Sequence, residues 1–270
     1  MRRCRSAVVA ALLAAAPVHA APPRPLAPDD CGWSGAQPAA LAAVDENFDL
    51  LLGDGRVATL SGLAFSRRAG DPRAVETLLD GRDLHVRLLS PEPDRWGRIR
   101  IRLYAREADG ALADVGEELA RRGLAVFRPD PDASGCRRRL LAAEAAARTA
   151  AAGFWARDGA LLDAGDRNAV AAASAGFLVV EGVVANVGEA RGRIYLNLGR
   201  VRTIDLAIVI LGRNISAFES QGVALRDLTG RRIRARGLLD RRFGPQIEIV
   251  GPDAIEVVET SGAEGVAKGR

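Results

Sequence analysis

The sequence predicts a mainly β protein of the α+β class, organised as two small β-rich domains. Short apolar stretches with strand spacing recur along the chain, and the first two flank the turn-forming segment Gly53-Asp54-Gly55-Arg56. A few stretches between the strand patterns have helical spacing with start and stop residues. Residues 157–176 are rich in Ala, Gly and Asp and divide the strand patterns into two groups, so we expect a linker there with at most a short helix.

Residues 1–20 have the pattern of a secretory signal peptide. Three arginines precede an apolar run at 7–16, and Val18-His19-Ala20 satisfies the small-residue rule for cleavage. The alternative, a buried N-terminal helix, leaves the basic flank and the cleavage pattern unexplained. We therefore expect a mature chain that begins near Ala21 and is periplasmic or secreted. No later stretch approaches the roughly 20 apolar residues of a membrane-spanning helix, so no transmembrane segment is predicted.

The charge of the mature chain is close to zero. The predicted leader holds 3 of the 38 basic residues and none of the 34 acidic ones, which leaves 35 basic against 34 acidic residues. The basicity of the whole chain therefore does not favour a nucleic-acid binder. Any basic surface must be local.

Two cysteines remain after the predicted cleavage, Cys31 and Cys136. Disulfides persist in an exported protein, so we predict that the two cysteines pair and contribute about 2 to 4 kcal/mol by restricting the unfolded chain. Two separate thiols are the alternative. The remaining histidine, His85, stands alone, which gives little support to a zinc site or to Ser-His-Asp chemistry.

The first predicted domain, residues 41–156, follows an extended segment at 21–40 whose first part is Pro-rich. Asp71 suits a helix N-cap and Pro72 the first helical position, so a helix is expected from there to Leu79. The run from Arg98 to Leu103 alternates strictly, which predicts a half-buried strand with three arginines on its open face. The other strands are expected at 48–52, 57–63 and 84–89, and the other helices at 115–122 and 137–152.

The second predicted domain, residues 177–260, has its elements in the order βββαββ, which is the order of an OB-type β-barrel. The tail at 261–270 is small and polar, and we expect it to be disordered. The strands are expected at 178–187, 193–198, 205–211, 231–238 and 246–249, with a helix at 216–222.

Three motifs in the first domain occur in a fixed order. They are Asp94-Arg95-Trp96-Gly97-Arg98 before the alternating strand, Ala-Arg-Arg-Gly-Leu-Ala at 120–125, and a helix rich in Ala and Glu that ends in Gly153-Phe154-Trp155. Over residues 44–156 their order and spacing resemble the staphylococcal-nuclease-like, or thermonuclease, family. The resemblance implies a five-stranded OB-type barrel with packed helices, and in active members calcium-dependent hydrolysis of DNA and RNA.

The family's chemistry needs carboxylates for the cation, a glutamate that activates water, and two arginines that neutralise the phosphate. Active members read Arg-Leu-x-Gly-Ile-Asp-x-Pro-Glu where this chain reads Thr-Leu-Ser-Gly-Leu-Ala-Phe-Ser-Arg at 59–67. Thr59 thus replaces the first arginine, Ala64 the metal aspartate and Arg67 the general base. The resemblance therefore implies a degenerate active site.

The second metal aspartate of the family falls at Asn47, and only the second arginine, Arg98, is retained. Asp45 and Asp49 are weak metal candidates, because a shift of two residues keeps a side chain on the same face of a strand. A single displaced carboxylate does not rebuild the site.

Several residues are candidates for binding a ligand without cleaving it. Arg67, Arg95, Arg98 and Arg100 are placed to hold a phosphate chain, and Tyr195 to stack a base. The alternatives are that these arginines are only solvated and that Tyr195 is a core or rim residue. A second alternation of arginines occurs at 231–236.

We therefore expect an exported, non-catalytic member of the thermonuclease family that needs no cofactor. Its predicted partners are single-stranded nucleic acid, another polyanion or a cell-envelope protein. The alternative is an active calcium-dependent endonuclease with relocated metal ligands. A protein-binding role without nucleic acid is the third hypothesis.

Overall fold

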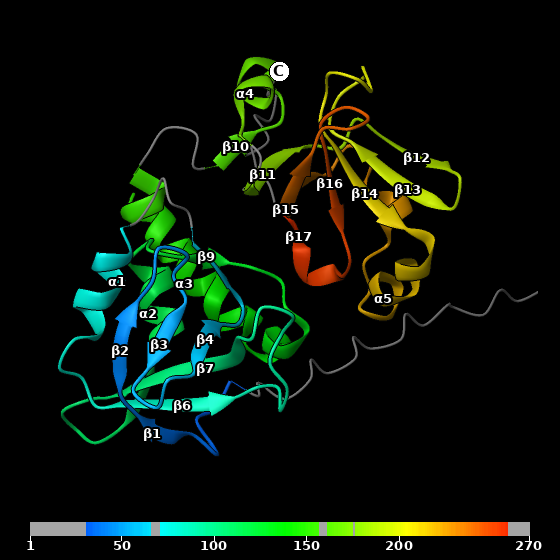
Figure 1. Cartoon of the computed structure of the whole chain (residues 1–270). Helices are drawn as coiled ribbons and strands as arrows, with labels where there is room; N and C mark the ends of the chain where they lie inside the picture. Colours follow the sequence, from blue (N-terminus) through cyan, green and yellow to red (C-terminus); the bar gives the residue numbers. More distant parts are fainter. Residues whose placement is uncertain (1–30, 66–70, 157–160, 175, 259–270) are drawn as a thin grey trace, which may run out of the picture.

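The computed structural model describes residues 31–65, 71–156, 161–174 and 176–258 (Figure 1). Sheet predominates over helix, which confirms the predicted α+β class and its mainly β character. The predicted signal peptide and the predicted C-terminal tail lie outside the described residues. Within the described residues, no helix is both long and apolar enough to cross a membrane.

The first half of the chain forms one large sheet with helices packed beside it. The strands of this sheet are β1 (Gln37–Ala39), β2 (Leu41–Val44), β3 (Leu50–Leu52), β4 (Val57–Leu60), β6 (Leu84–Leu88), β7 (Ile99–Arg106) and β8 (Leu112–Asp114). A separate short ladder joins β5 (Leu63–Ala64) to β9 (Val126–Phe127). The helices are α1 (Pro72–Leu79), α2 (Val115–Arg121) and α3 (Arg137–Thr149), with 3-10 turns η1 (Pro131–Cys136) and η2 (Gly153–Ala156).

The second half forms a second large sheet with shorter helices. Its strands are β10 (Leu161–Asp163), β11 (Phe177–Val183), β12 (Asn186–Ala190), β13 (Arg193–Asn197), β14 (Ala207–Leu211), β15 (Arg232–Asp240), β16 (Gln246–Ile249) and β17 (Ile255–Val257). The helical elements are α4 (Arg167–Ala172), α5 (Ile215–Ser220), η3 (Gly212–Asn214), η4 (Leu225–Leu228) and η5 (Pro252–Ala254).

The two sheets share the pairing pattern of six strands, and each adds other strands to it. In the first sheet the order is β1-β6-β7-β4-β3-β2, and in the second it is β10-β11-β15-β16-β14-β13-β12. Each contains an antiparallel meander of three strands, β2-β3-β4 in the first sheet and β12-β13-β14 in the second. The last strand of each meander pairs in parallel with a later strand, β4 with β7 and β14 with β16. Within the described residues no ladder joins the two ends of either sheet, so the predicted closed barrels are not confirmed.

An apolar core fills each half, and a smaller cluster connects them. The smaller cluster contains Ala64, Val126, Ala147 and Trp155 from the first half and Val179 of β11 from the second. Because these side chains are buried together, the two halves pack directly against each other.

A fully buried ion pair lies at the same contact. Arg236 of β15 and Glu144 of α3 have no exposed side-chain surface, and their Nη1 and Oε2 atoms are 2.9 Å apart. Glu144 also accepts a hydrogen bond from the backbone nitrogen of Phe127 at 2.8 Å. Arg236 contacts Glu256 as well. We call this ion pair, together with the apolar cluster around Ala64, the interdomain joint.

Predictions of single elements are confirmed where the sequence contains a helix-capping residue or a regular hydrophobic spacing. Asp71 accepts a hydrogen bond from the Arg73 nitrogen at 3.0 Å, and α1 begins at Pro72 as expected. The stretch at 157–176 differs from the expected linker, because β10 pairs with β11 and Leu162 and Val170 are buried in the second core. The segment expected to be extended, 21–40, contributes β1, which pairs with β6.

Candidate functional site

Arg98, the one catalytic position that the resemblance retains, lies just before β7 and is held by two carboxylates. Its guanidinium contacts Asp94 at 2.8 Å and Asp49 at 3.1 Å. Burial alone raises the pKa of Asp94, but hydrogen bonds from the Arg98 side chain and the backbone outweigh it and lower that pKa. The ring of Trp96 lies 4.8 Å from the Arg98 guanidinium and 3.9 Å from that of Arg95. The Arg98 side chain is therefore already paired with carboxylates of the protein.

The positions that the resemblance assigns to the missing catalytic groups do not converge on a polar site. Ala64 is buried in the interdomain joint. Thr59 lies on β4 beside Arg100 of β7. Asp45 caps its own turn, because it accepts hydrogen bonds at 2.8 Å from the backbone nitrogens of Asn47 and Asp49. Arg67, predicted to bind a ligand, lies outside the described residues.

The arginines of β7 do not lie on an open face of the strand, although the alternation predicts one. Arg100 contacts Asp132 at 2.7 Å, and Arg102 contacts Asp114 with both side chains almost fully buried. The prediction of a half-buried strand is wrong at Arg102, because η1 and the start of α2 bring acidic residues over this face. The described arginines of this strand are therefore neutralised within the fold.

A metal site of the predicted kind is not assembled from the weak candidates. In the described part of the chain, the acidic, His and Cys side chains that gather closely enough for an ion are Cys31, Asp114 and Glu117. Cys31 is bonded to Cys136, as predicted, with 4.8 Å between their Cα atoms, and Asp114 contacts Arg102. This donor set does not suit calcium, which takes several oxygen ligands.

Three of the four arginines in the second alternation, at 231–236, are also neutralised, and Arg231 is exposed. Arg232 and Arg234 contact Glu181 of β11 at 3.5 and 2.7 Å, and Arg236 lies in the interdomain joint. These arginines therefore stabilise the second sheet and its contact with the first half.

Other arginines of the second half are exposed and make no ion pair with a described residue. They lie on the β12–β13 hairpin, on the loop between β13 and β14, and after β14. Residues 177–258 hold 12 arginines against 9 acidic residues, so the local charge is positive. We call five of them the unpaired set: Arg191, Arg193, Arg200, Arg202 and Arg213.

The strand register places part of this set on one face, which we call the outer face of β13, β14 and β16. Tyr195 lies opposite Val209, and Val209 lies beside Glu248. Arg193 shares the face of Tyr195 because alternate residues of a strand point the same way. A Cβ atom added at Gly188, the β12 partner of Tyr195, would lie 4.0 Å from the Arg202 guanidinium. Tyr195 is half-buried on this face.

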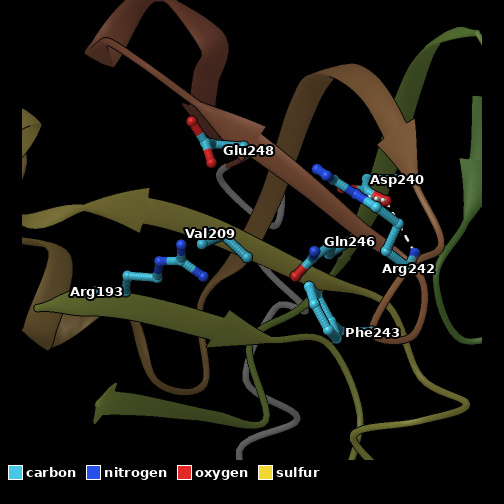
Figure 2. A pocket seen from close by; sticks show the side chains of 7 residues that line it. All are labelled: Arg193, Val209, Asp240, Arg242, Phe243, Gln246 and Glu248. Carbon is cyan, nitrogen blue, oxygen red and sulfur yellow. Dashed lines mark hydrogen bonds and ion pairs between the residues drawn. The ribbon is translucent and has the colours of Figure 1, made fainter. Parts of the chain in front are cut away.

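A cavity of about 160 Å³ opens on the outer face (Figure 2). Arg242 and Asp240 in its wall contact each other at 2.7 Å. Phe243, on the β15–β16 loop, is 79% exposed. The lining residues are Arg193, Val209, Asp240, Arg242, Phe243, Gln246 and Glu248.

Sequence reasoning found Tyr195 but missed the rest of this face. A signal was available in Arg241-Arg242-Phe243-Gly244-Pro245, where an aromatic residue sits between two arginines and a turn-forming pair. The parallel pairing of β14 with β16, which brings Glu248 beside Val209, has no local sequence signal.

Comparison of the sequence with protein-family models gives no match, and no curated protein matches it significantly.

Proposed function

We propose that this chain is an exported, non-catalytic member of the staphylococcal-nuclease-like family that binds a polyanion through its second half. The single observation that carries the non-catalytic part is the place of Ala64. The family's metal aspartate corresponds to this methyl group, which is packed in the interdomain joint among Val126, Ala147, Trp155 and Val179. The Glu144 carboxylate of that joint is already bound by Arg236 and by the Phe127 nitrogen, so these surroundings do not suit a hydrated cation.

We further propose that each half is an OB-type barrel. In the first half β1 and β2 are separated only by Ala40 but lie at opposite ends of the strand order. In the second half β11 and β12 are separated by two residues, and β12 again ends the order. One bent strand that serves both ends of a five-stranded sheet is the way an OB-type barrel closes.

The polyanion part of the proposal is supported by the contrast between the two sets of arginines. Arg98 and the arginines of β7 are held by carboxylates, whereas the unpaired set, which includes Arg193 and Arg202, has no ion-pair partner among the described residues. An arginine without a carboxylate partner can donate to phosphate or sulfate without first losing an existing contact. The predicted near-zero charge of the mature chain then coexists with a locally basic face.

Export is proposed from the signal-peptide pattern and is supported by the Cys31–Cys136 bond. Disulfides of this kind persist in oxidising compartments. The expected product is periplasmic or secreted.

The second candidate function is an active calcium-dependent nuclease, and one contact favours it. Asp49 lies 3.1 Å from Arg98, so a carboxylate does stand beside the retained arginine. Calcium would have to compete with Arg98 for that carboxylate, and the Ala64 position supplies no second one.

The experiment that tests the proposal follows binding and cleavage in the same sample. Purified mature protein is incubated with a labelled single-stranded DNA and calcium, with Arg98→Ala purified in parallel. We expect both proteins to bind the strand and neither to cut it. Calcium-dependent cleavage by the unmutated protein alone would establish the nuclease instead. Absence of any binding to DNA, heparin or polyphosphate would favour a protein partner.

A further inference from the structure

The cavity on the outer face has the size of a site for one ring of a longer ligand. At about 160 Å³ it is smaller than the roughly 300 to 1,000 Å³ clefts that enclose whole small molecules. Arg193 of the unpaired set lines it, so a chain that contacts Arg193 reaches the cavity (Figure 2).

Phe243 supplies an exposed aromatic ring in the cavity wall, and its loop is fixed by neighbouring backbone. Gly244 has a φ of 102°, which favours glycine, and a side chain there would lie 2.8 Å from the carbonyl oxygen of Arg202. The carbonyl of Pro245 accepts a hydrogen bond from the Ala207 nitrogen at 3.1 Å. A large exposed ring on a fixed loop is a ready stacking partner for a flat base.

Glu248 is unexpected on a face that binds anions. Its carboxylate lines the cavity and makes no direct ion pair with a described residue, whereas the neighbouring Asp240 contacts Arg242 at 2.7 Å. Arg242 interacts with Glu248 electrostatically without direct contact. A carboxylate repels phosphate, so a ligand that passes here must offset the repulsion by donating hydrogen bonds to it.

We propose that the cavity takes one base of a single-stranded nucleic acid, stacked on Phe243, and that Glu248 gives it a preference for guanine. Guanine presents two adjacent N–H donors on one edge, which suit the two oxygens of a carboxylate. Its opposite edge carries acceptors suited to an arginine such as Arg193. Thymine offers a single N–H between two carbonyl oxygens, which Glu248 disfavours. This inference rests on the proposed polyanion binding and names its ligand.

Sugar polymers that carry sulfate or phosphate fit the arginines but not the ring. They have no flat aromatic surface to stack on Phe243 and no pair of N–H donors for Glu248. The proposal therefore distinguishes nucleic acid from these other polyanions.

The test uses the full mature chain and oligonucleotides of about twelve nucleotides, within reach of one such fold. The probes are oligothymidine and the same strand with one central guanine, adenine or cytosine, with heparin as a polyanion without bases. We expect the guanine-containing strand to bind about fivefold more tightly than oligothymidine. Glu248→Gln should remove that preference, and Phe243→Ala should weaken every base-containing strand about fivefold while heparin binding is unchanged.

Matched controls are Glu219→Gln, another exposed carboxylate, and Leu238→Ala, another exposed apolar side chain, 62% exposed. Both lie outside the cavity and should leave the preference intact. Thermal unfolding checks that each variant folds. Equal affinity for all four strands, with Phe243→Ala as tight as the unmutated protein, would overturn the base site while salt-sensitive binding persists. If the unmutated protein bound none of the probes, the proposed function would be overturned as well.

Discussion

Arg98 lies just before β7 and Arg100 and Arg102 lie on it, and each contacts at least one carboxylate. A phosphate that approached Arg100 would compete with Asp132, and Arg102 is closed to solvent. Around the outer face, Arg193 and Arg202 have no such competitor among the described residues. Whether an arginine is available to bind an anionic ligand thus depends on its acidic neighbours more than on its place in an alternating strand.

Asp205 holds the arginine-bearing loop between β13 and β14. Its carboxylate accepts hydrogen bonds from Arg167 Nε at 2.6 Å and from the Val201 nitrogen at 2.8 Å. The Arg167 hydrogen bond is the main cause of a pKa lowered to about 2. Because the unfolded value is higher, near 4, this stabilisation is complete above about pH 4 and is lost as the pH falls toward 2.

Asp205→Asn is therefore expected to flatten the loss of thermal stability between pH 4 and pH 2. The measurement is the unfolding temperature as a function of pH for the variant and the unmutated chain. Asp227→Asn, an exposed control, should keep the steeper profile. If the Asp205→Asn profile matched that of the unmutated chain, the carboxylate would not hold this loop in the way described.

The sequence shows which residues are charged but not which charges meet. The arginine alternation at 98–103 is visible, yet Arg100 finds Asp132 only because η1 folds back over β7. Likewise, Arg236 reads as one of an exposed series, although it is fully buried against Glu144, 92 residues earlier. Pairings at such separations depend on the packing of both halves, which no local pattern encodes.

At the level of elements, hydrophobic periodicity and capping residues predict the longer strands and helices. The Asp71 cap and the strand predicted from Arg98 to Leu103 correspond to observed elements, whereas the predicted βββαββ order of the second half is not observed exactly, because the strand expected at 178–187 is divided into β11 and β12 and β17 follows β16. The short strands β5, β9, β10 and β17 have no such signal, because two or three residues are too few to show a period. Two of them, β5 and β9, contribute Ala64 and Val126 to the interdomain joint.

The contact between α3 and β15 gives a prediction for stability. Arg236→Met leaves the buried Glu144 with only its longer, 3.5 Å contact to Arg148, and removing the main partner of such a pair costs about 3 to 5 kcal/mol. Combining it with Glu144→Gln should recover part of that loss, because the amide oxygen can still accept from the Phe127 nitrogen. Urea unfolding measures both. A double variant no more stable than the single one would contradict the uncompensated charge as the cause.

Across the whole molecule, the disulfide connects the start of the described chain to the start of α3. It closes a loop with a sequence separation of 105 residues. The double variant Cys31→Ser/Cys136→Ser should lose about 2 to 5 kcal/mol of unfolding free energy, since its unfolded chain is less restricted. Alkylation of the native mature protein should find neither thiol free. An unchanged unfolding free energy would show that the bond contributes nothing to the folded state.

The two sheets share the pairing of six strands but have different roles. The first packs against the second through the interdomain joint, where Ala64 stands at the position that the proposed family uses for its metal aspartate. The second presents the outer face, its unpaired arginines and the cavity beside Phe243. The central claim is that this second half, and not the arginines of β7, binds a polyanion.

The salt dependence of binding to a single-stranded oligonucleotide tests that claim most directly. Each phosphate contact on a single strand contributes about 0.7 to the slope of log affinity against log salt. Arg193→Ala/Arg202→Ala should reduce the magnitude of the slope by about 1.4, and Arg100→Ala should leave it unchanged. A slope that is unaffected by the double variant but reduced by Arg100→Ala would place the binding face on the first half and contradict the account.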